Sequence, residues 1–204
     1  MNKSKEHWEN VYSTKADEQL SWTQPTPGIS LQWILESSPA RDAKVIDIGA
    51  GISELTDRLL AENFKQPAVL DISGAALERA KKRLGAKASL VQWIESDITA
   101  FAPTEKFSFW HDRAVFHFLA KPEDRDKYVA TLTQTLIPGG FALIATFATD
   151  GPSKCSGLEV MRYDERTLTQ ELGSAFHLIK SQRYTHTTPW GSQQNFVFCL
   201  FKKT

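Results

Sequence analysis

Short apolar runs alternate with helical segments along most of the chain, and this alternation limits the possible folds more than any other feature. We expect five strands in this part of the chain, at residues 44–51, 68–73, 89–98, 107–112 and 141–148. The intervening segments 53–62, 74–85 and 123–136 read as helices, with Ser53 as a possible N-cap and Pro138-Gly139-Gly140 as a stop signal. Strands that alternate with helices of this length form parallel βαβ units with helices on both sheet faces.

The two ends of the chain complete this prediction. A helix at 28–37 precedes the first strand, and a loop at 149–163 leads to a helix at 164–172. Two last strands, 177–186 and 195–201, leave no room for a helix between them, so they should form an antiparallel hairpin. The predicted fold class is therefore α/β: a Rossmann-like, seven-stranded, mostly parallel sheet with a C-terminal antiparallel hairpin, helices on both faces, and one reversed strand at its end. The 204 residues suit one domain, 1–204, with one buried core.

Charge and composition exclude several classes of partner. The chain has 24 basic and 24 acidic side chains, so it lacks the basic excess of a nucleic-acid-binding protein. No apolar run approaches the roughly 20 residues that span a bilayer, and the polar start shows no signal peptide. Two distant cysteines, Cys155 and Cys199, read as free thiols in the cytoplasm rather than metal ligands. We expect no metal and no membrane contact, and a monomer.

The first strand ends in a glycine turn, Asp47-Ile48-Gly49-Ala50-Gly51. Ligands of such sheets bind beyond the carboxyl ends of the strands, and glycines let the backbone approach them closely. A dinucleotide fingerprint would need a third glycine where Glu54 stands, and Asp47 would repel a pyrophosphate. A ligand with an ammonium and a sulfonium group fits this charge better. A purely structural turn is the alternative.

The next two strands also end in acids, Asp71 and Asp97. A carboxylate at Asp71 can accept hydrogen bonds from both hydroxyls of a ribose, although it could instead cap the helix near Ser73. Asp97 and the backbone N–H of Ile98 could read an adenine edge. Ile72 could pack on the ring.

The segments VIDIGAGIS, VLDIS and ESDI resemble, in order and spacing, the cofactor motifs of class I S-adenosylmethionine methyltransferases. The resemblance covers nearly the whole chain and implies S-adenosylmethionine as cofactor, with S-adenosylhomocysteine as product. It implies Asp47 near the methionine amino end, glycines against the cofactor, Asp71 on the ribose, and Asp97 with Ile98 at the adenine. Ser53 stands where the family often has a third glycine, and its N–H could face the cofactor carboxylate. The expected cofactor-binding set is Trp22, Asp47, Gly49, Ala50, Gly51, Asp71, Ile72, Asp97, Ile98 and His111.

The fourth strand leads into candidate catalytic residues, Asp112, Arg113 and His117. Asp112 and Arg113 could instead form a structural ion pair, and His117 could be a core histidine. The stretch 110–132 resembles thiopurine and related thiol methyltransferases, which have Asp-Arg here and then a Pro-x-x-Arg-x-x-Tyr helix start. Protein-lysine methyltransferases of this fold also carry an acid and a base here, usually followed by Gly-Thr, where this chain has Ala114-Val115.

The N-terminal residues 1–27 resemble the tryptophan-bearing lid of the thiol-methylating enzymes. Trp22 is the candidate lid residue, since aromatic faces attract a sulfonium cation. Trp8 and Trp33 could equally be core residues. Cys155 could face the pocket, but a free loop cysteine is the simpler interpretation.

Together these features predict an S-adenosylmethionine-dependent methyltransferase that acts on a small molecule, at a thiol or another soft nucleophile. Arg113 could raise the thiolate fraction of a thiol acceptor, while His117 or Asp112 could act as a base for a less acidic one. A protein-lysine methyltransferase is the first alternative, and it predicts an acidic rim around an open pocket. A cofactor-binding module without activity is the second.

Overall fold

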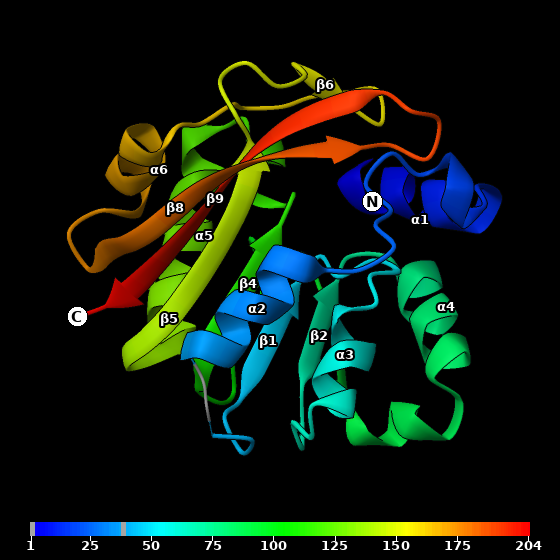
Figure 1. The fold of residues 1–204 in the computed structure, drawn as a ribbon, viewed down its shortest axis with the longest axis horizontal. Coiled ribbons are helices and arrows are strands. Elements are labelled where there is room, and N and C mark those ends of the chain that lie inside the picture. Colours follow the sequence, from blue (N-terminus) through cyan, green and yellow to red (C-terminus); the bar gives the residue numbers. More distant parts are fainter. Residues whose placement is uncertain (1–2, 38–39) are drawn as a thin grey trace.

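The protein is described by a computed structural model that covers residues 3–37 and 40–204 (Figure 1). Seven strands form one sheet in the order β3-β2-β1-β4-β5-β9-β8. A separate two-stranded hairpin, β6–β7, lies after β5. The strands are β1 (Val45–Ile48), β2 (Ala68–Asp71), β3 (Gln92–Glu95), β4 (Phe107–Arg113), β5 (Leu136–Phe147), β6 (Lys154–Cys155), β7 (Leu158–Glu159), β8 (Phe176–Thr187) and β9 (Gln193–Lys203).

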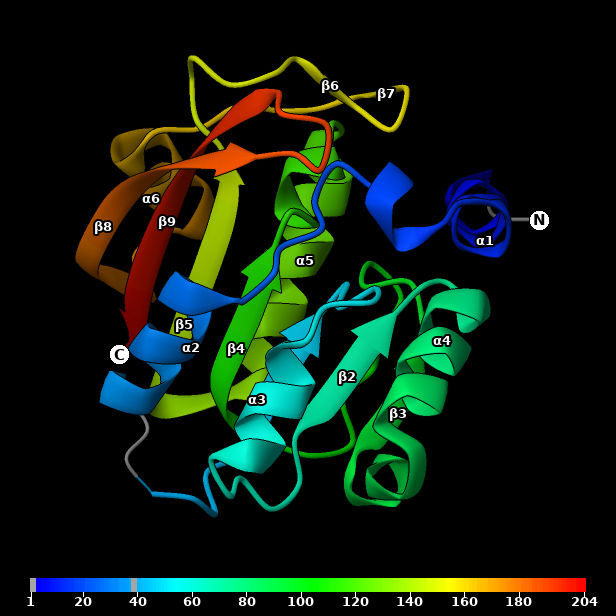
Figure 2. The same cartoon turned by 45° about the vertical axis from the view of Figure 1, so that its right-hand side comes forward.

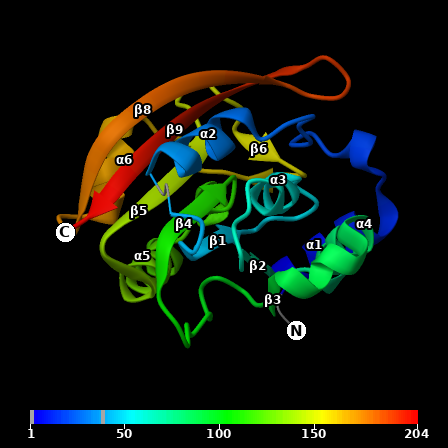
Figure 3. The same ribbon diagram turned by 60° about the horizontal axis from the view of Figure 1, so that its bottom comes forward.

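Helices cover both faces of the sheet, as predicted (Figures 2 and 3). The helices α2, α3 and α4 lie on one face, and α5 and α6 lie on the other, each burying leucines or aromatic rings against the strands. No helix in the described ranges is both long and apolar enough to cross a bilayer. The α-helices are α1 (Lys3–Thr14), α2 (Gly28–Ser37), α3 (Leu55–Ala61), α4 (Gly74–Leu84), α5 (Pro122–Thr135) and α6 (Glu165–Leu172).

The sheet has its switch point between β1 and β4. From β1 the chain builds outward through β2 and β3, and it then returns to place β4 and β5 on the other side of β1. These five strands are parallel, so their carboxyl ends share one edge of the sheet. A switch point opens a crevice at that edge, where ligands of such folds bind.

The reversed strand is β9, and it lies inside the sheet rather than at its end. It pairs antiparallel with β5 on one side and with β8 on the other. Burial explains this order: residues 196–201 of β9 are buried on both faces, whereas most of β8 is exposed. A strand that is apolar on both faces is stable only between neighbours, so the more polar β8 takes the edge.

The helix after the first strand begins later than the expected residue 53. It starts at Leu55, and Ser53 Oγ accepts a hydrogen bond from Leu55 N at 3.2 Å without capping a longer helix. Arg83 donates to the carbonyl oxygens of Ile52 and Ser53, at 2.7 and 2.8 Å. Because those carbonyls are engaged outside the helix, the turn extends to residue 54.

The expected loop at 149–163 contains the hairpin β6–β7. Its turn residues Ser156 and Gly157 have positive φ angles of 49° and 78°. This conformation matches the twist of a two-residue hairpin, and a Ser-Gly pair is a known turn signal. The hairpin carries Cys155 to a buried position.

A buried polar chain fixes the end of β4 against α5. Tyr128 donates its hydroxyl proton to Asp112 Oδ2 at 2.6 Å and accepts a hydrogen bond from Trp110 Nε1 at 2.8 Å. All three side chains are fully buried. The chain of bonds joins a helix to the strand end that borders the crevice.

Removing the central hydroxyl should therefore destabilise the fold. Tyr128→Phe leaves the Trp110 N–H and one Asp112 acceptor position unpaired, at a cost of about 2 kcal/mol. Urea unfolding followed by fluorescence measures this difference. The control is Tyr184→Phe on the edge strand, which should change the unfolding free energy by less than about 0.5 kcal/mol. Equal effects of the two substitutions would refute the structural role.

Candidate active site

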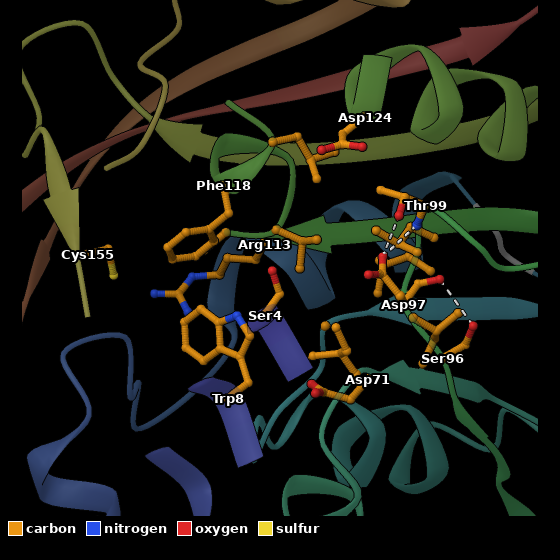
Figure 4. A pocket seen from close by; sticks show the side chains of 18 of the residues that line it. Ser4, Trp8, Asp71, Ser96, Asp97, Thr99, Arg113, Phe118, Asp124 and Cys155 are labelled. Carbon is orange, nitrogen blue, oxygen red and sulfur yellow. Dashed lines mark hydrogen bonds between the residues drawn. The ribbon is translucent and has the colours of Figure 1, made fainter. Parts of the chain in front are cut away.

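A cavity of about 470 Å³ lies over the carboxyl ends of β1, β2 and β4. Helix α1 and the segment that follows it pass over this edge (Figure 2). Figure 4 shows that the cavity has two chemically different ends. Asp71 and Asp97 stand at one end, whereas Trp8, Arg113, Phe118 and Cys155 gather at the other.

The glycine turn after β1 forms part of the cavity wall. Gly49 and Gly51 have φ angles of 60° and 55°, a region that other residues rarely adopt. A side chain at Gly49 would overlap Val115, and one at Gly51 would overlap the hydroxyl of Tyr12. Glycine is therefore required at both positions for backbone conformation and for close approach.

Asp71 joins the turns that follow β1 and β2. Its two oxygens accept hydrogen bonds from Gly51 N at 2.8 Å and Ser73 N at 2.9 Å. Burial raises the pKa of this carboxyl to about 6, although both backbone bonds oppose the shift. Ser73, not Asp71, caps α4 by accepting from Ala76 N. The carboxylate lines the cavity and has lone pairs left for a ligand.

The strand ends β2 and β3 supply an apolar slot beside Asp97. Leu70, Ile72 and Ile98 line this part of the cavity. Asp97 Oδ1 accepts hydrogen bonds from Thr99 N at 2.9 Å and Thr99 Oγ1 at 2.8 Å, which fixes the carboxylate. An apolar slot with a carboxylate on one side suits a flat, heteroaromatic ring.

Asp47 lies below a second, smaller cavity of about 50 Å³. Its Oδ1 is 2.6 Å from His111 Nδ1, and His111 Nε2 is 2.8 Å from Ser30 Oγ. Asp47 Oδ2 is buried and has no hydrogen-bond partner among the described residues. Trp22, Gly49 and Arg113 line both cavities, so the two adjoin.

Arg113 is a half-buried residue, and its guanidinium has no acidic partner in the described part of the chain. Its Nη1 donates to the carbonyl oxygen of Trp22 at 2.9 Å, and the guanidinium lies 5.2 Å from the Phe196 ring centre. Its Nε and Nη2 are buried and have no acceptor within the described ranges. Burial lowers the pKa of Arg113 to about 10, so the group remains charged at neutral pH.

Aromatic rings enclose this end of the cavity. The ring of Trp8 contacts Phe118 and Trp22, with centroid distances of 5.1 and 5.6 Å, and Tyr12 lies 6.2 Å from Trp22. Trp8 and Trp22 come from the N-terminal segment, and Phe118 follows β4. The wall combines π faces with one guanidinium, which suits a desolvated ligand.

Comparisons with known proteins agree with this geometry. Residues 45–140 match the family described as a methyltransferase domain, and this span contains the glycine turn, Asp71, Asp97 and Arg113. No curated protein matches the chain in sequence. The protein is a methyltransferase, with its methyltransferase domain at residues 45–140. It has the Rossmann-like α/β fold with a C-terminal antiparallel hairpin that the sequence predicts.

Solved structures of low sequence identity share the fold of the methyltransferase. One is described for the conversion of a disulfide bond into a thioacetal group during echinomycin biosynthesis: 16% identity, 98% of this chain and 92% of that chain, TM-score 0.77. A second is the N-methyltransferase NodS from Bradyrhizobium japonicum WM9: 17% identity, 97% and 98% covered, TM-score 0.72. A third is 1,6-didemethyltoxoflavin-N1-methyltransferase from Burkholderia thailandensis: 20% identity, 98% and 84% covered, TM-score 0.67.

Two of the candidate catalytic residues of the methyltransferase lie outside the cavity. Asp112 accepts hydrogen bonds from Val115 N, Phe116 N and the Tyr128 hydroxyl, and it makes no ion pair with Arg113. His117 is fully buried against Phe147, and its Nδ1 accepts from Phe147 N at 3.2 Å. Burial lowers the pKa of His117 to about 3, which keeps the ring neutral. Neither side chain borders either cavity.

Helix α1 is anchored beside the site by polar contacts. Glu9 accepts hydrogen bonds from Ser73 Oγ at 2.8 Å and from Ala75 N at 3.2 Å, at the N-terminus of α4. Arg79 of α4 donates to the carbonyl oxygens of Tyr12 and Lys15. Of the expected lid, residues 1–27, the first two lie outside the described residues.

Cys155 lies in the wall of the larger cavity rather than on a free loop. Its Sγ is 4.0 Å from Ser21 Oγ, and burial raises its pKa to about 11. His7 Nε2 lies 3.3 Å from Ser156 Oγ, and His186 Nε2 lies 2.7 Å from the carbonyl oxygen of Ser21. These contacts join the N-terminal segment to both hairpins.

The sequence did not single out three residues of this site. Tyr12 fills the space over Gly51, Phe118 contacts Trp8 edge to face, and Glu9 anchors α1. An i, i+4 pair, Trp8 and Tyr12, was the available signal, since it places two aromatic rings on one helix face. The described residues contain no group of three or more His, Cys, Asp or Glu placed to share a metal ion.

The contact between Gly51 and Tyr12 predicts a specific substitution effect. Gly51→Ala should destabilise the protein more than Gly85→Ala, because Gly85 has nearly the same φ of 57° but open space around it. We expect about 1 kcal/mol for the shared backbone strain and at least 1 kcal/mol more for the overlap at Gly51. Urea unfolding compares the two variants.

A second substitution tests the cause. Adding Tyr12→Phe to Gly51→Ala removes the hydroxyl that overlaps the new methyl group, so part of the lost stability should return. If the two glycine variants lose the same stability, or if Tyr12→Phe restores none, the close packing of Tyr12 on Gly51 is not important for stability.

Proposed function

We propose that the larger cavity holds the nucleoside part of S-adenosylmethionine, with its methionine part directed to the smaller cavity. Asp71 would accept hydrogen bonds from the ribose hydroxyls, and Asp97 with the Ile98 N–H would bind the adenine edge. Ile72 would pack on the adenine ring. Asp47 would face the ammonium group, while Gly49, Ala50 and Gly51 lie against the cofactor.

The residues present fit this cofactor. Asp47 Oδ2 is a buried acceptor that lacks a partner in the described ranges, and an ammonium group would supply the missing donor. Gly49 lines both cavities, and a side chain there would overlap Val115 in the wall of the larger one. The carboxylates at the adenosine end suit a ligand without phosphates.

We propose that the acceptor is a small molecule, methylated at a thiol or another soft nucleophile. The observation that carries this proposal is Arg113: a buried guanidinium in an aromatic wall, with two N–H groups that lack acceptors among the described residues. A buried cation of this kind calls for an anion, which a thiolate supplies. The aromatic side chains around Arg113 would also limit the access of water to the reaction.

The chemistry needs little from the protein. S-adenosylmethionine supplies an electrophilic methyl group on a sulfonium. Arg113 would favour ionisation of the acceptor thiol, whose proton leaves to solvent, and Trp8 with Phe118 would align the thiolate. The thiolate sulfur then donates the electron pair of the new S–C bond, while the electrons of the old methyl–sulfur bond remain with the product S-adenosylhomocysteine. Asp112 and His117 would only support the structure.

The alternative, a lysine side chain of a partner protein, fits the site less well. That reading predicts an acidic rim, but the larger cavity is lined by two exposed lysines, Lys3 and Lys121, together with the half-buried Asp124. Arg113 would also repel an ammonium at the position of transfer. The larger cavity extends beyond the proposed cofactor position. This leaves space for an acceptor, which argues against an inactive cofactor-binding module.

The similar structures leave the methylated atom open between sulfur and nitrogen. The similar structure described for echinomycin biosynthesis concerns conversion of a disulfide bond into a thioacetal group, which is chemistry at sulfur. The two others carry nitrogen-methylating names. The unpaired charge of Arg113 favours sulfur, because a thiol ionises near neutral pH whereas an amine must be neutral to react.

We further propose that residues 1–27 act as a lid, with Trp22 over the methionine end. The segment buries Tyr12 on the glycine turn and holds Trp8 against Phe118. The two buried free thiols suit a cytoplasmic location. A monomeric state and the lack of nucleic-acid partners stay predictions.

The raised pKa of Asp71 makes cofactor affinity depend on pH. The ionised carboxylate is the form that accepts both ribose hydroxyls, and burial places its pKa at about 6, above the ordinary 3.8. Raising the pH from 5 to 7 should therefore strengthen S-adenosylhomocysteine binding by up to about tenfold. The same shift means that ionisation of Asp71 costs stability as the pH rises through 6 in the free protein. Calorimetric titration at several pH values measures the affinity.

Asp71→Asn is the matched control for this experiment. It should bind S-adenosylhomocysteine more weakly at pH 7 and lose the pH dependence between 5 and 7. Unchanged affinity in Asp71→Asn at pH 7 would remove Asp71 from the cofactor site.

Removal of the Arg113 charge should change the pH profile of thiol methylation. Arg113→Ala should lower kcat/KM for small thiols at pH 7 by about 10- to 100-fold, and by less at pH 9, where the thiol ionises without help. Arg113→Lys should retain part of the activity because it keeps the charge. Methyl transfer to panels of aryl thiols, alkyl thiols and ring nitrogens, assayed by product formation, provides the measurement.

Two outcomes would contradict this role. Turnover that survives Arg113→Ala at every pH would exclude the thiolate proposal. A loss of S-adenosylhomocysteine affinity, with normal turnover at saturating cofactor, would instead pair Arg113 with the cofactor carboxylate. Arg162→Ala, an exposed arginine that donates to the Gly151 carbonyl oxygen, is the control for a general loss of positive charge.

A further inference from the structure

Three polar side chains form a continuous buried chain beneath the smaller cavity. Ser30 on α2, His111 on β4 and Asp47 on β1 are exposed by only 2%, 3% and 2%. Ser30 Oγ lies 2.8 Å from His111 Nε2, and His111 Nδ1 lies 2.6 Å from Asp47 Oδ1. The chain connects three separate elements at the switch point of the sheet.

The chemistry of the end groups fixes the direction of these hydrogen bonds. An ionised Asp47 can only accept, so His111 Nδ1 carries the proton that it donates to Oδ1. In the neutral imidazole, Nε2 is then an acceptor, and the Ser30 hydroxyl donates to it. The Asp47 carboxylate thus selects the ring tautomer, and the Ser30 hydroxyl holds the other ring nitrogen in place.

This arrangement leaves one carboxylate oxygen for a ligand. Oδ1 is occupied by His111, whereas Oδ2 is buried and has no partner in the part of the chain described. Asp47, His111 and Ser30 all line the smaller cavity, and this cavity shares Trp22, Gly49 and Arg113 with the larger one. A second protein hydrogen bond, to Oδ2, would compete with a ligand for that oxygen. The single bond to Oδ1 orients the carboxylate and leaves Oδ2 available.

We infer that His111 and Ser30 are positioning residues, which hold Asp47 so that Oδ2 receives the ammonium group of the cofactor's methionine part. The inference rests on the proposed placement of the methionine part in the smaller cavity. His111 acts through Asp47, because both of its ring nitrogens are engaged by Asp47 and Ser30 and neither is left for the cofactor. A hydrogen-bonded partner that orients a binding group is typical of well-organised sites.

A purely structural role makes a different prediction. A buried network that only supports the fold would, when broken, weaken every ligand of the site by a similar factor. A positioning role weakens only ligands that carry the ammonium group. S-adenosylhomocysteine carries it, and 5′-methylthioadenosine lacks the whole amino-acid part but keeps the adenosine.

The experiment compares the dissociation constants of these two ligands by calorimetry. His111→Leu should weaken S-adenosylhomocysteine binding by about tenfold and change 5′-methylthioadenosine binding by less than about twofold. His111→Asn should restore most of the affinity, because its amide N–H takes the place of the Nδ1–H. Ser30→Ala, a milder change, should give the same selective loss at about threefold.

The outcomes separate this inference from the proposed site. Equal losses for both ligands, or no loss for either, in His111→Leu would overturn the positioning role. Asp47→Ala with unchanged S-adenosylhomocysteine affinity would instead contradict the placement of the methionine part. If His111→Leu fails to fold, the ratio of the two affinities in Ser30→Ala and His111→Asn decides the question.

Discussion

The hydrogen bond from Gly51 N–H to the Asp71 carboxylate is the contact on which the rest of the site depends. It joins the turn after β1 to the turn after β2, and the second Asp71 oxygen binds Ser73 N at the start of α4. Only a residue without a side chain can sit at Gly51, because Tyr12 of α1 packs on it. Two strand ends, one helix start and the N-terminal helix are therefore positioned by one carboxylate. The burial that this packing requires also raises the pKa of Asp71 to about 6, so structure and charge at this point are linked.

Opposite charges stand at the two ends of the larger cavity. Asp71 and Asp97 lie at one end and the guanidinium of Arg113 lies at the aromatic end, where it also borders the smaller cavity that Asp47 lines. In the described residues Arg113 has no acidic partner, and Asp112, its neighbour in sequence, is turned to the other side of β4 and bound by α5. Strand alternation explains this division, since consecutive side chains of β4 point to opposite faces of the sheet. On one face of the sheet, Asp112 is buried among its hydrogen-bond donors. On the other face, Arg113 directs its guanidinium to the two cavities.

The sequence predicts much of this architecture but little of its side-chain geometry. The alternation of strands and helices gave the seven-stranded sheet, because periodicity reports which faces are buried. The inside position of β9 could be read only from its two-sided burial, and the start of α3 depended on Arg83, which is distant in sequence. Asp71 and Asp97 could be predicted as cavity residues because parallel strands end at one edge. In the sequence, Asp112 and His117 are equally good candidates for a functional role. Their burial outside the cavity follows from contacts with Tyr128 and Phe147, which the sequence does not reveal.

Helix α1 is held beside the cavity by contacts with distant parts of the chain. Helix α1 has few buried residues of its own, so its position depends on what it contacts rather than on a core of its own. Glu9 accepts a hydrogen bond from the Ala75 N–H at the start of α4, where a negative charge is favoured. Arg79 of α4 donates to the carbonyl oxygens of Tyr12 and Lys15 near the C-terminal end of α1. These polar contacts surround the aromatic contact of Trp8 with Phe118. Helix α1 contacts Ser73 and Gly51, whose backbone N–H groups bind Asp71, so one group of interactions sets both the position of α1 and the order of the turns at the cavity.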